Sequence, residues 1–167
     1  MQYWLFKSEF ATFSISDLAH APNQATTWEG VRNYQARNFL RDDINVGDQA
    51  FFYHSTSQYS KYSPPGIVGI IEVVKSGYPD DSAFDPNSRY FDPKSCREKP
   101  TWYQVDVRLV KSFTHYVGLD LIKASPELKD MVVARKGNRL SISKVTPDEW
   151  NFICFFLSRG KTVEQWW

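Results

Sequence analysis

The chain has 167 residues, of which 42% are hydrophobic and 16% aromatic, and its 20 basic and 19 acidic residues give a net charge of +1. This composition excludes a disordered chain, and the near-neutral charge excludes a protein that coats nucleic acid without specificity. The N-terminal segment has no signal-peptide pattern, and no apolar run reaches the length of a membrane span. We therefore expect a soluble, intracellular protein with no membrane partner, cytoplasmic or, in a eukaryote, nuclear.

The N-terminal half contains predicted strands and short helices. Residues 3–7 alternate aromatic and aliphatic side chains, which is typical of a strand. Residues 14–17 (SISD) fit a capping box and predict the start of a short helix. The polar residues 20–26 predict a loop, residues 31–41 a helix and residues 49–54 a second strand.

The middle of the chain contains two predicted loops and two predicted strands. Residues 56–66 have no periodicity and contain two prolines, which predicts an exposed, mobile loop. Residues 67–74 are β-branched and predict a strand. Residues 77–100 are rich in Asp, Pro and Ser, and a loop of this length is either functional or a plain surface excursion. Residues 102–111 alternate apolar and polar side chains and predict a further strand.

The C-terminal part ends in a helix with a clear start signal. Residues 119–131 predict short helical turns interrupted by a proline, and residues 140–145 predict a strand. Residues 146–149 (TPDE) place Thr at the N-cap, Pro at the first helical position and Glu at the third. The helix is expected to run to about Arg159, with Gly160 as its stop.

Strands outnumber long helices, and the two do not alternate regularly as in a Rossmann-type sheet. The sequence has no internal repeat and no linker. We therefore predict an α+β fold that is mostly β, a small barrel with flanking short helices, in a single domain over residues 1–167. The expected oligomeric state is a monomer.

The sequence offers no metal, cofactor or catalytic site. Cys96 and Cys154 are too few for a disulfide framework or a Cys-rich zinc site. None of the three histidines has metal-ligand spacing: they are His20, His54 and His115. The aspartates of residues 77–100 lack EF-hand spacing and predict turns, and the scattered glycines form no phosphate-binding loop.

Seven segments together resemble the EVE domain family. They are YWLFKSE (3–9), TWEGVRNYQARNFLR (27–41), VGDQAFFYHS (46–55), GIVGIIEVV (66–74), GYPD (77–80), WYQVDV (102–107) and RLSISKVTPDEW (139–150). The resemblance implies a PUA-like β-pseudobarrel, related to YTH and ASCH domains, that binds nucleic acid carrying modified bases and has no known catalytic activity of its own. Phe10 departs from the proline that the family usually has at this position.

Trp28 and the predicted helix 31–41 are the main candidates from the residues themselves. Trp28 lies in a turn beside Gly30, where its flat face can stack on a base or plug the end of the barrel. By resemblance it also matches the Trp that stacks on the modified base in related readers. Helical spacing places four polar or aromatic residues on one face of this helix: Asn33, Tyr34, Arg37 and Arg41. This face either binds a base and its phosphates or is simply exposed to solvent.

Further candidates lie at the ends of predicted strands. The parity of Trp102 places it with polar residues, which predicts a pocket wall or a cross-strand aromatic pair. By resemblance, Ser8 and Ser55 lie near the pocket. Residues that adjoin these two serines in the sequence complete the candidate set: Tyr53 and His54 are expected to contact the base, and Lys7 is expected to contact a phosphate. Arg139 is either a phosphate contact or half of a structural ion pair.

These residues favour a reader in which a modified base enters an aromatic pocket. Methylated cytosine in DNA is the first expected target, and modified RNA the second. A base-processing enzyme using His54 or Glu9 is the second hypothesis, and a protein-interaction module using Trp166–Trp167 or the 56–66 loop is the third. An RNA-binding protein associated with RNA modification is a variant of the first.

Overall fold

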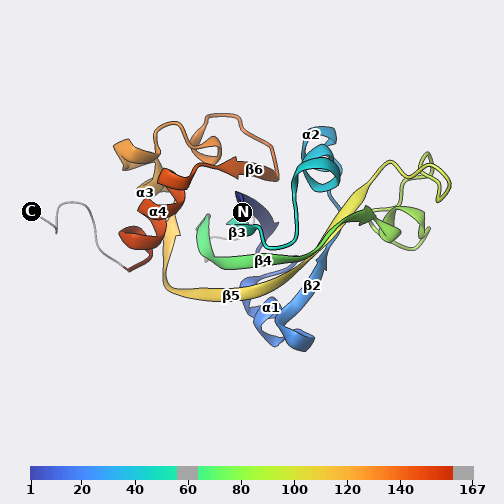
Figure 1. Cartoon of the computed structure of the whole chain (residues 1–167), viewed down its shortest axis with the longest axis horizontal. Helices are drawn as coiled ribbons and strands as arrows, with labels where there is room; N and C mark the ends of the chain where they lie inside the picture. Colours follow the sequence, from blue (N-terminus) through green and yellow to red (C-terminus); the bar gives the residue numbers. More distant parts are fainter. Residues whose placement is uncertain (56–63, 160–167) are drawn as a thin grey trace, which may run out of the picture.

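A computed structural model describes residues 1–55 and 64–159. Its six strands form one curved sheet in the order β2-β5-β4-β3-β1-β6 (Figure 1). They are β1 (Tyr3–Glu9), β2 (Ala25–Trp28), β3 (Gln49–Ser55), β4 (Gly66–Pro79), β5 (Tyr103–Gly118) and β6 (Ile142–Val145). The helices are α1 (Ile15–His20), α2 (Tyr34–Asn38), α3 (Leu119–Ala124) and α4 (Pro147–Phe155), with short 3₁₀ and π turns between them. The predicted α+β, mostly β class with flanking short helices is confirmed.

β1 and β3 form a parallel pair in a sheet that is otherwise antiparallel. The residues of this pair are buried on both faces, which explains their near-continuous apolar runs WLF and AFFY. In the register of the pair, Ser8 lies opposite His54 and Glu9 opposite Ser55. Because the strands are parallel, their C-terminal ends meet at one edge of the sheet.

Two hydrophobic cores lie on the two faces of the sheet. The first takes side chains from all six strands, including Phe6, Trp28 and Phe52, together with residues of α1 and α2. The second joins β1 and β3 to α3 and α4, and in it Trp150 stacks on Tyr3 and Phe51. The alternation in β1 decides which core each side chain enters.

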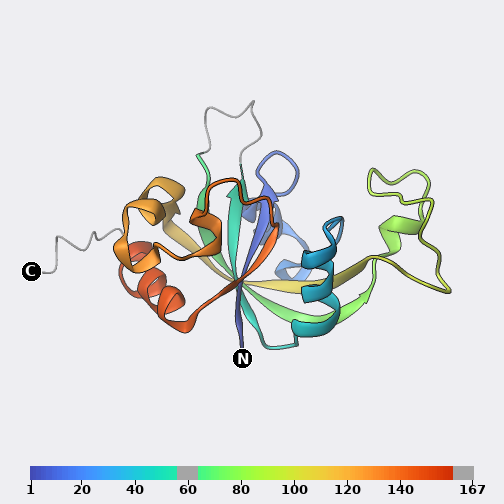
Figure 2. The same cartoon turned by 90° about the horizontal axis from the view of Figure 1, so that it is seen from above.

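The β4–β5 ribbon is longer than the sequence predicts. The expected strands 67–74 and 102–111 extend to 66–79 and 103–118, with several register shifts between them. The ribbon runs out beyond the rest of the sheet and carries residues 80–102, here called the arm (Figure 2). Pairing between two strands distant in sequence stabilises the polar extensions, and such pairing leaves no local pattern.

Two further expectations need correction. Residues 25–28, which span the end of the predicted loop 20–26 and the predicted turn at Trp28, form β2, because they pair with β5 from Ala25–Arg108 to Trp28–Val105. The predicted helix 31–41 begins only at Tyr34, since Asn33 is its N-cap and accepts a hydrogen bond from the Ala36 amide at 3.0 Å. Asn33 therefore does not lie on a helical face, and the helix continues as a π turn (Phe39–Asp43).

The two helix starts predicted from capping boxes are confirmed. Both Ser14 and Thr146 form complete capping boxes, with Asp17 and Glu149 at the third position. Most of the 56–66 loop, the stop at Gly160 and the Trp166–Trp167 pair fall outside the described residues. In the described part of the chain, no helix has both the length and the apolar character needed to span a membrane.

Candidate functional site

A cavity of about 820 Å³ opens where the C-terminal ends of β1 and β3 meet the turn that follows β2. Its walls come from the ends of β1 and β3, from the segment 26–33, from the arm and from the residues that precede β6. Six of the predicted site residues line it: Lys7, Ser8, Trp28, Asn33, Ser55 and Arg139. The tertiary structure thus brings together residues that are up to 132 positions apart (7 to 139) in the sequence.

Trp28 forms part of the cavity wall and part of the core at once. It is 7% exposed, and its ring centroid lies 5.2 Å from that of Phe6 and 5.3 Å from that of Phe52. These two aromatic contacts fix the indole. A ligand in the cavity therefore meets a side chain that loses little conformational freedom on binding.

The parallel strand ends supply hydroxyl groups. Ser8 and Ser55 both line the cavity, at adjacent positions of the β1–β3 register. The Ser8 hydroxyl donates to the Phe13 carbonyl at 2.7 Å, which leaves its lone pairs to accept from a ligand. Ser141, which directly precedes β6, adds a third hydroxyl and is tied to β1 by a 2.8 Å hydrogen bond from the Lys7 amide to its carbonyl.

A buried carboxylate, Asp80, holds the turn that forms one wall. Its side chain is fully buried and accepts from the Gly30 amide at 2.9 Å and from Arg32 at 2.8 Å. Burial by itself raises the pKa of Asp80, but hydrogen bonds from Ser82, Arg32 and Gly30 outweigh it and hold that pKa below its ordinary value. The carboxylate is thus charged at neutral pH and links the 28–33 turn to the start of the arm.

The arm contributes a wall that the sequence analysis missed. Arg32 donates two hydrogen bonds to the Tyr90 carbonyl, at 3.1 and 2.6 Å, and both Arg89 and Tyr90 line the cavity. The Tyr90 ring lies against Gly30, which has φ +80°, and a Cβ at this position would come within 2.6 Å of the ring. Gly30 was the available signal, because a glycine marks either positive φ or a close approach.

The cavity carries charges of both signs. Its charged lining residues are Lys7, Glu9, Glu29, Arg32, Arg89 and Arg139. Burial lowers the pKa of Lys7. Burial also raises the pKa of Glu29, as does nearby Asp80, while Arg32 opposes this. The two carboxylates can accept hydrogen bonds from base amino groups, and they oppose the attraction of the cations for a phosphate.

Four predicted base-binding residues lie away from the cavity. Trp102 is 6% exposed, stacks on Tyr34 with 5.0 Å between ring centroids, and donates its indole N–H to Asp92 at 2.7 Å. Tyr53 is buried in the second core. His54 is 5% exposed, and its Nε2 accepts from the Ile15 amide at 3.0 Å. Strand alternation alone did not show which face of the sheet these side chains meet.

Two predicted phosphate-binding residues also lie outside it. Arg37 donates to the Thr101 carbonyl at 2.6 Å and lies 5.2 Å from the Tyr34 ring, so it anchors the C-terminal end of the arm to α2. Arg41 forms a bidentate pair with Asp42, at 2.7 Å for both bonds. Arg41 therefore corresponds to the solvated-face alternative, whereas Arg37 is half-buried against the arm.

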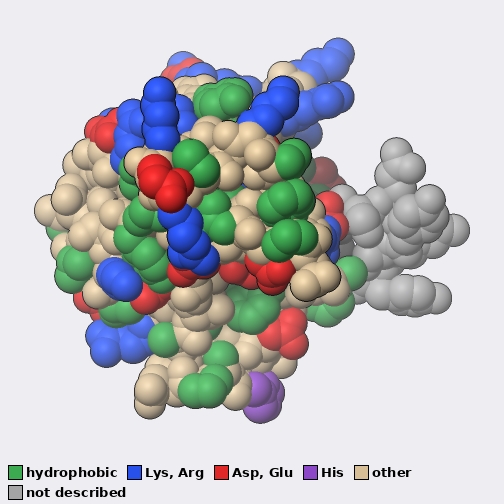
Figure 3. All heavy atoms as spheres, turned by 90° about the vertical axis from the view of Figure 1, so that its right-hand side faces the viewer, with side chains coloured by type: hydrophobic (Ala, Val, Ile, Leu, Met, Phe, Trp, Pro, Cys, Tyr) green, Lys and Arg blue, Asp and Glu red, His purple; other side chains and the backbone are tan. Residues whose placement is uncertain are grey.

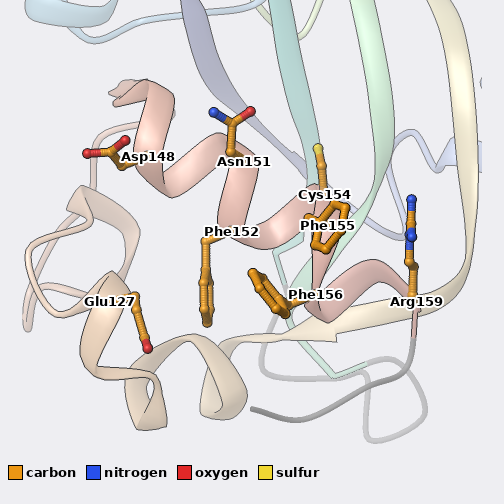
Figure 4. A pocket seen from close by; sticks show the side chains of 8 residues that line it. All are labelled: Glu127, Asp148, Asn151, Phe152, Cys154, Phe155, Phe156 and Arg159. Atoms are coloured by element: carbon orange, nitrogen blue, oxygen red, sulfur yellow. The ribbon is translucent and has the colours of Figure 1, made fainter. Parts of the chain in front are cut away.

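A second cavity, of about 580 Å³, lies along α4 (Figure 4). Phe152, Phe155 and Phe156 supply its apolar part, and Glu127, Asp148 and Arg159 lie around it. None of the predicted site residues lines it. Cys154 borders this cavity, and burial raises the pKa of its thiol to about 11, which keeps it protonated at neutral pH.

Comparison with known proteins identifies the family. The family model of the EVE domain matches residues 2–155. The chain belongs to the EVE domain family. Its relatives include thymocyte nuclear protein 1 of Gallus gallus, 42% identical over 90% of this chain and 66% of that protein, and of Homo sapiens, 39% identical over 90% and 72%.

Solved structures of relatives have the same fold as this EVE domain. A protein from Pseudomonas syringae is 45% identical, with a TM-score of 0.83 over 91% of this chain and 97% of that one. The human THYN1 protein, solved in complex with DNA containing 5-methylcytosine, is 39% identical, with a TM-score of 0.83 over 92% and 95%. The similarity to these structures confirms the predicted PUA-like architecture.

Proposed function

We propose that this EVE domain binds nucleic acid and reads one modified base, with 5-methylcytosine in DNA as the first candidate, in the cavity walled by Trp28. The observation that carries the proposal is the cavity itself, which combines a fixed indole with hydroxyls from two parallel strand ends. The relative crystallised with 5-methylcytosine DNA supports the choice of ligand.

The chemistry of the cavity fits the requirements of a flipped base. Extrusion from a duplex costs a few kcal/mol, and stacking on an aromatic side chain returns about 1–3 kcal/mol per base. The hydroxyls of Ser8 and Ser55 and the carboxylate of Glu29 are available to pair with the base edge. Phe6 and Phe52 already hold the indole in place. Binding therefore costs little conformational entropy at Trp28, and most of the stacking free energy contributes to affinity.

A matched pair of substitutions tests the assignment. Trp28 and Trp102 are buried to the same degree, at 7% and 6% exposure, but only Trp28 lines the cavity. We expect Trp28→Ala to weaken binding to a 5-methylcytosine duplex at least tenfold, about 1.4 kcal/mol, and to abolish the preference over the unmodified duplex. Trp102→Ala is expected to retain the preference. Affinity is measured by fluorescence anisotropy on protein whose fold is checked by circular dichroism.

The opposite pattern, with the preference lost in Trp102→Ala and kept in Trp28→Ala, would contradict the proposal. A chemical change in the bound base would support the enzyme hypothesis instead. Of the groups on which that hypothesis depends, Glu9 lines the cavity and His54 does not. Mass spectrometry of the oligonucleotide after prolonged incubation detects such turnover, and we expect the base to be recovered unaltered.

A further inference from the structure

A basic groove of about 540 Å³ lies between α2 and residues 132–144, beside the base cavity. The two hollows share Asn33 and Arg139, so they meet at these side chains. Figure 3 shows Lys and Arg side chains gathered along the top of the molecule, the end at which α2 and β6 lie in Figure 1. The basic groove is therefore continuous with the mouth of the cavity.

The charges of the groove are positive and lack acidic partners. Its cationic side chains are Arg135, Lys136, Arg139 and Lys144. None of its lining residues is acidic, and within residues 1–55 and 64–159 none of these four cations forms an ion pair. The Lys144 ammonium lies 5.5 Å from the centroid of the Trp4 ring and 5.8 Å from that of the Phe39 ring, so its partners among the described residues are aromatic rings and not carboxylates.

The turn at the rim of the groove contains a buried polar group without a partner among the described residues. Gly137 has φ +73°, and a Cβ at this position would meet nothing within 4 Å. Asn138 uses its side-chain carbonyl oxygen to accept from the Leu140 amide at 3.1 Å, while its buried side-chain nitrogen has no hydrogen-bond partner in the described structure.

The charge of the groove contrasts with that of the cavity. The cavity contains Glu9 and Glu29, which disfavour a phosphate, whereas the groove contains only cations among its charged lining residues. We propose that the basic groove binds the phosphodiester backbone of the strand whose base enters the cavity. This inference rests on the proposed function and assigns Arg135, Lys136 and Lys144 a role beside Arg139.

Charge neutralisation at two groove lysines tests the inference. The variant is Lys136→Gln with Lys144→Gln, and the matched control is Lys123→Gln with Lys129→Gln, two exposed lysines that line neither the groove nor the cavity. Each phosphate contact contributes about 0.9 to the slope of log affinity against log salt, which is worth about fivefold in affinity at physiological salt. We expect the groove variant to lose about fivefold per lysine and about 2 units of slope.

Both a 5-methylcytosine duplex and its unmodified counterpart are titrated at several salt concentrations. Equal losses for the two duplexes, with the preference for the modified one retained, support the groove. An affinity and salt slope equal to those of the lysine control overturn it. If wild-type protein shows no preference for the modified duplex, the proposed function fails, while the comparison of salt slopes still decides the role of the groove.

Discussion

At the scale of single residues, the same side chains serve the core and the site. Trp28 packs on Phe6 and Phe52 and also walls the cavity, so its position is set by the core before any ligand arrives. Asp80 is fully buried and yet organises the Gly30 turn. Rigid placement of this kind lowers the ordering cost of binding.

His54 has a structural role that predicts a pH effect. Burial lowers its pKa, partly opposed by Asp17, and its neutral Nε2 accepts from the Ile15 amide. The folded state thus binds a proton less readily than the unfolded state. The contribution of neutral His54 to the free energy of unfolding is therefore complete above the unfolded-state pKa of about 6.5. It is lost as the pH falls from that value through the lowered pKa of the folded state.

We expect the free energy of unfolding, measured in urea between pH 8 and pH 5, to decline below about pH 6.5 in the wild type. His54→Gln should flatten this decline. His115→Gln, at an exposed position of β5, should preserve it. An unchanged pH profile in His54→Gln would show that another group titrates.

At the scale of elements, short local signals fix the ends of the helices. The capping box of Thr146 and Glu149 begins α4, and α4 places Trp150 against Tyr3 and Phe51. The helix therefore fastens the second core to the strands whose other ends form the cavity.

Removal of the N-cap in Thr146→Ala is expected to lower the free energy of unfolding by about 1 kcal/mol, because the Glu149 amide loses its acceptor at 3.2 Å. Asn151→Ala, at an exposed position of the same helix, is the control and should change it by less than about 0.5 kcal/mol. Urea denaturation measures both. Equal effects would mean that the cap contributes little here.

At the scale of the whole molecule, the cavity depends on the attachment of the arm to the barrel. Arg32 connects Asp80 with the Tyr90 carbonyl, and Arg37 connects α2 with the Thr101 carbonyl. The arm thus contacts the barrel through hydrogen bonds near both of its ends. Its Tyr90 then closes one side of the base cavity.

Asp80→Asn is expected to destabilise the protein by about 2–4 kcal/mol. This is somewhat less than the cost of breaking a fully buried ion pair, because the Arg32 side chain is 23% exposed. Asp81→Asn breaks an exposed pair with Arg97 and should cost less than about 1 kcal/mol. Urea denaturation compares the two variants. The depressed pKa of Asp80 also predicts that the wild type loses this stabilisation only as the pH falls below about 4. An Asp80→Asn protein as stable as the control would contradict the anchoring role.

Much of the fold could be predicted from local signals. The alternation in residues 3–7 and 49–54, the two capping boxes and the proline-broken turns after residue 119 each correspond to an element of the structure. β2 was missed because residues 25–28 become a strand only by pairing with β5. The helix was predicted to begin at residue 31, but it begins at Tyr34 because the Asn33 side chain caps it. An Asn can either cap a helix or lie inside one, and the sequence pattern did not distinguish the two.

The candidate site could be predicted only in part. Resemblance and residue chemistry indicated Trp28, Ser8 and Ser55, which line the cavity. The same approach assigned Trp102 to the pocket, although its indole pairs with Asp92 on the arm side. It gave no indication of Tyr90, which belongs to a loop with no periodicity of its own.

The sequence by itself determined the strand alternation, the helix caps and the family, because these depend on neighbouring residues or on the order of short segments along the chain. Only the tertiary structure decided which of the candidate residues share a cavity. That choice depends on parallel pairing of β1 with β3 and on the attachment of the arm to Gly30 through Asp80 and Arg32. Contacts between segments far apart in the chain create this arrangement, and they leave no periodic trace in the sequence.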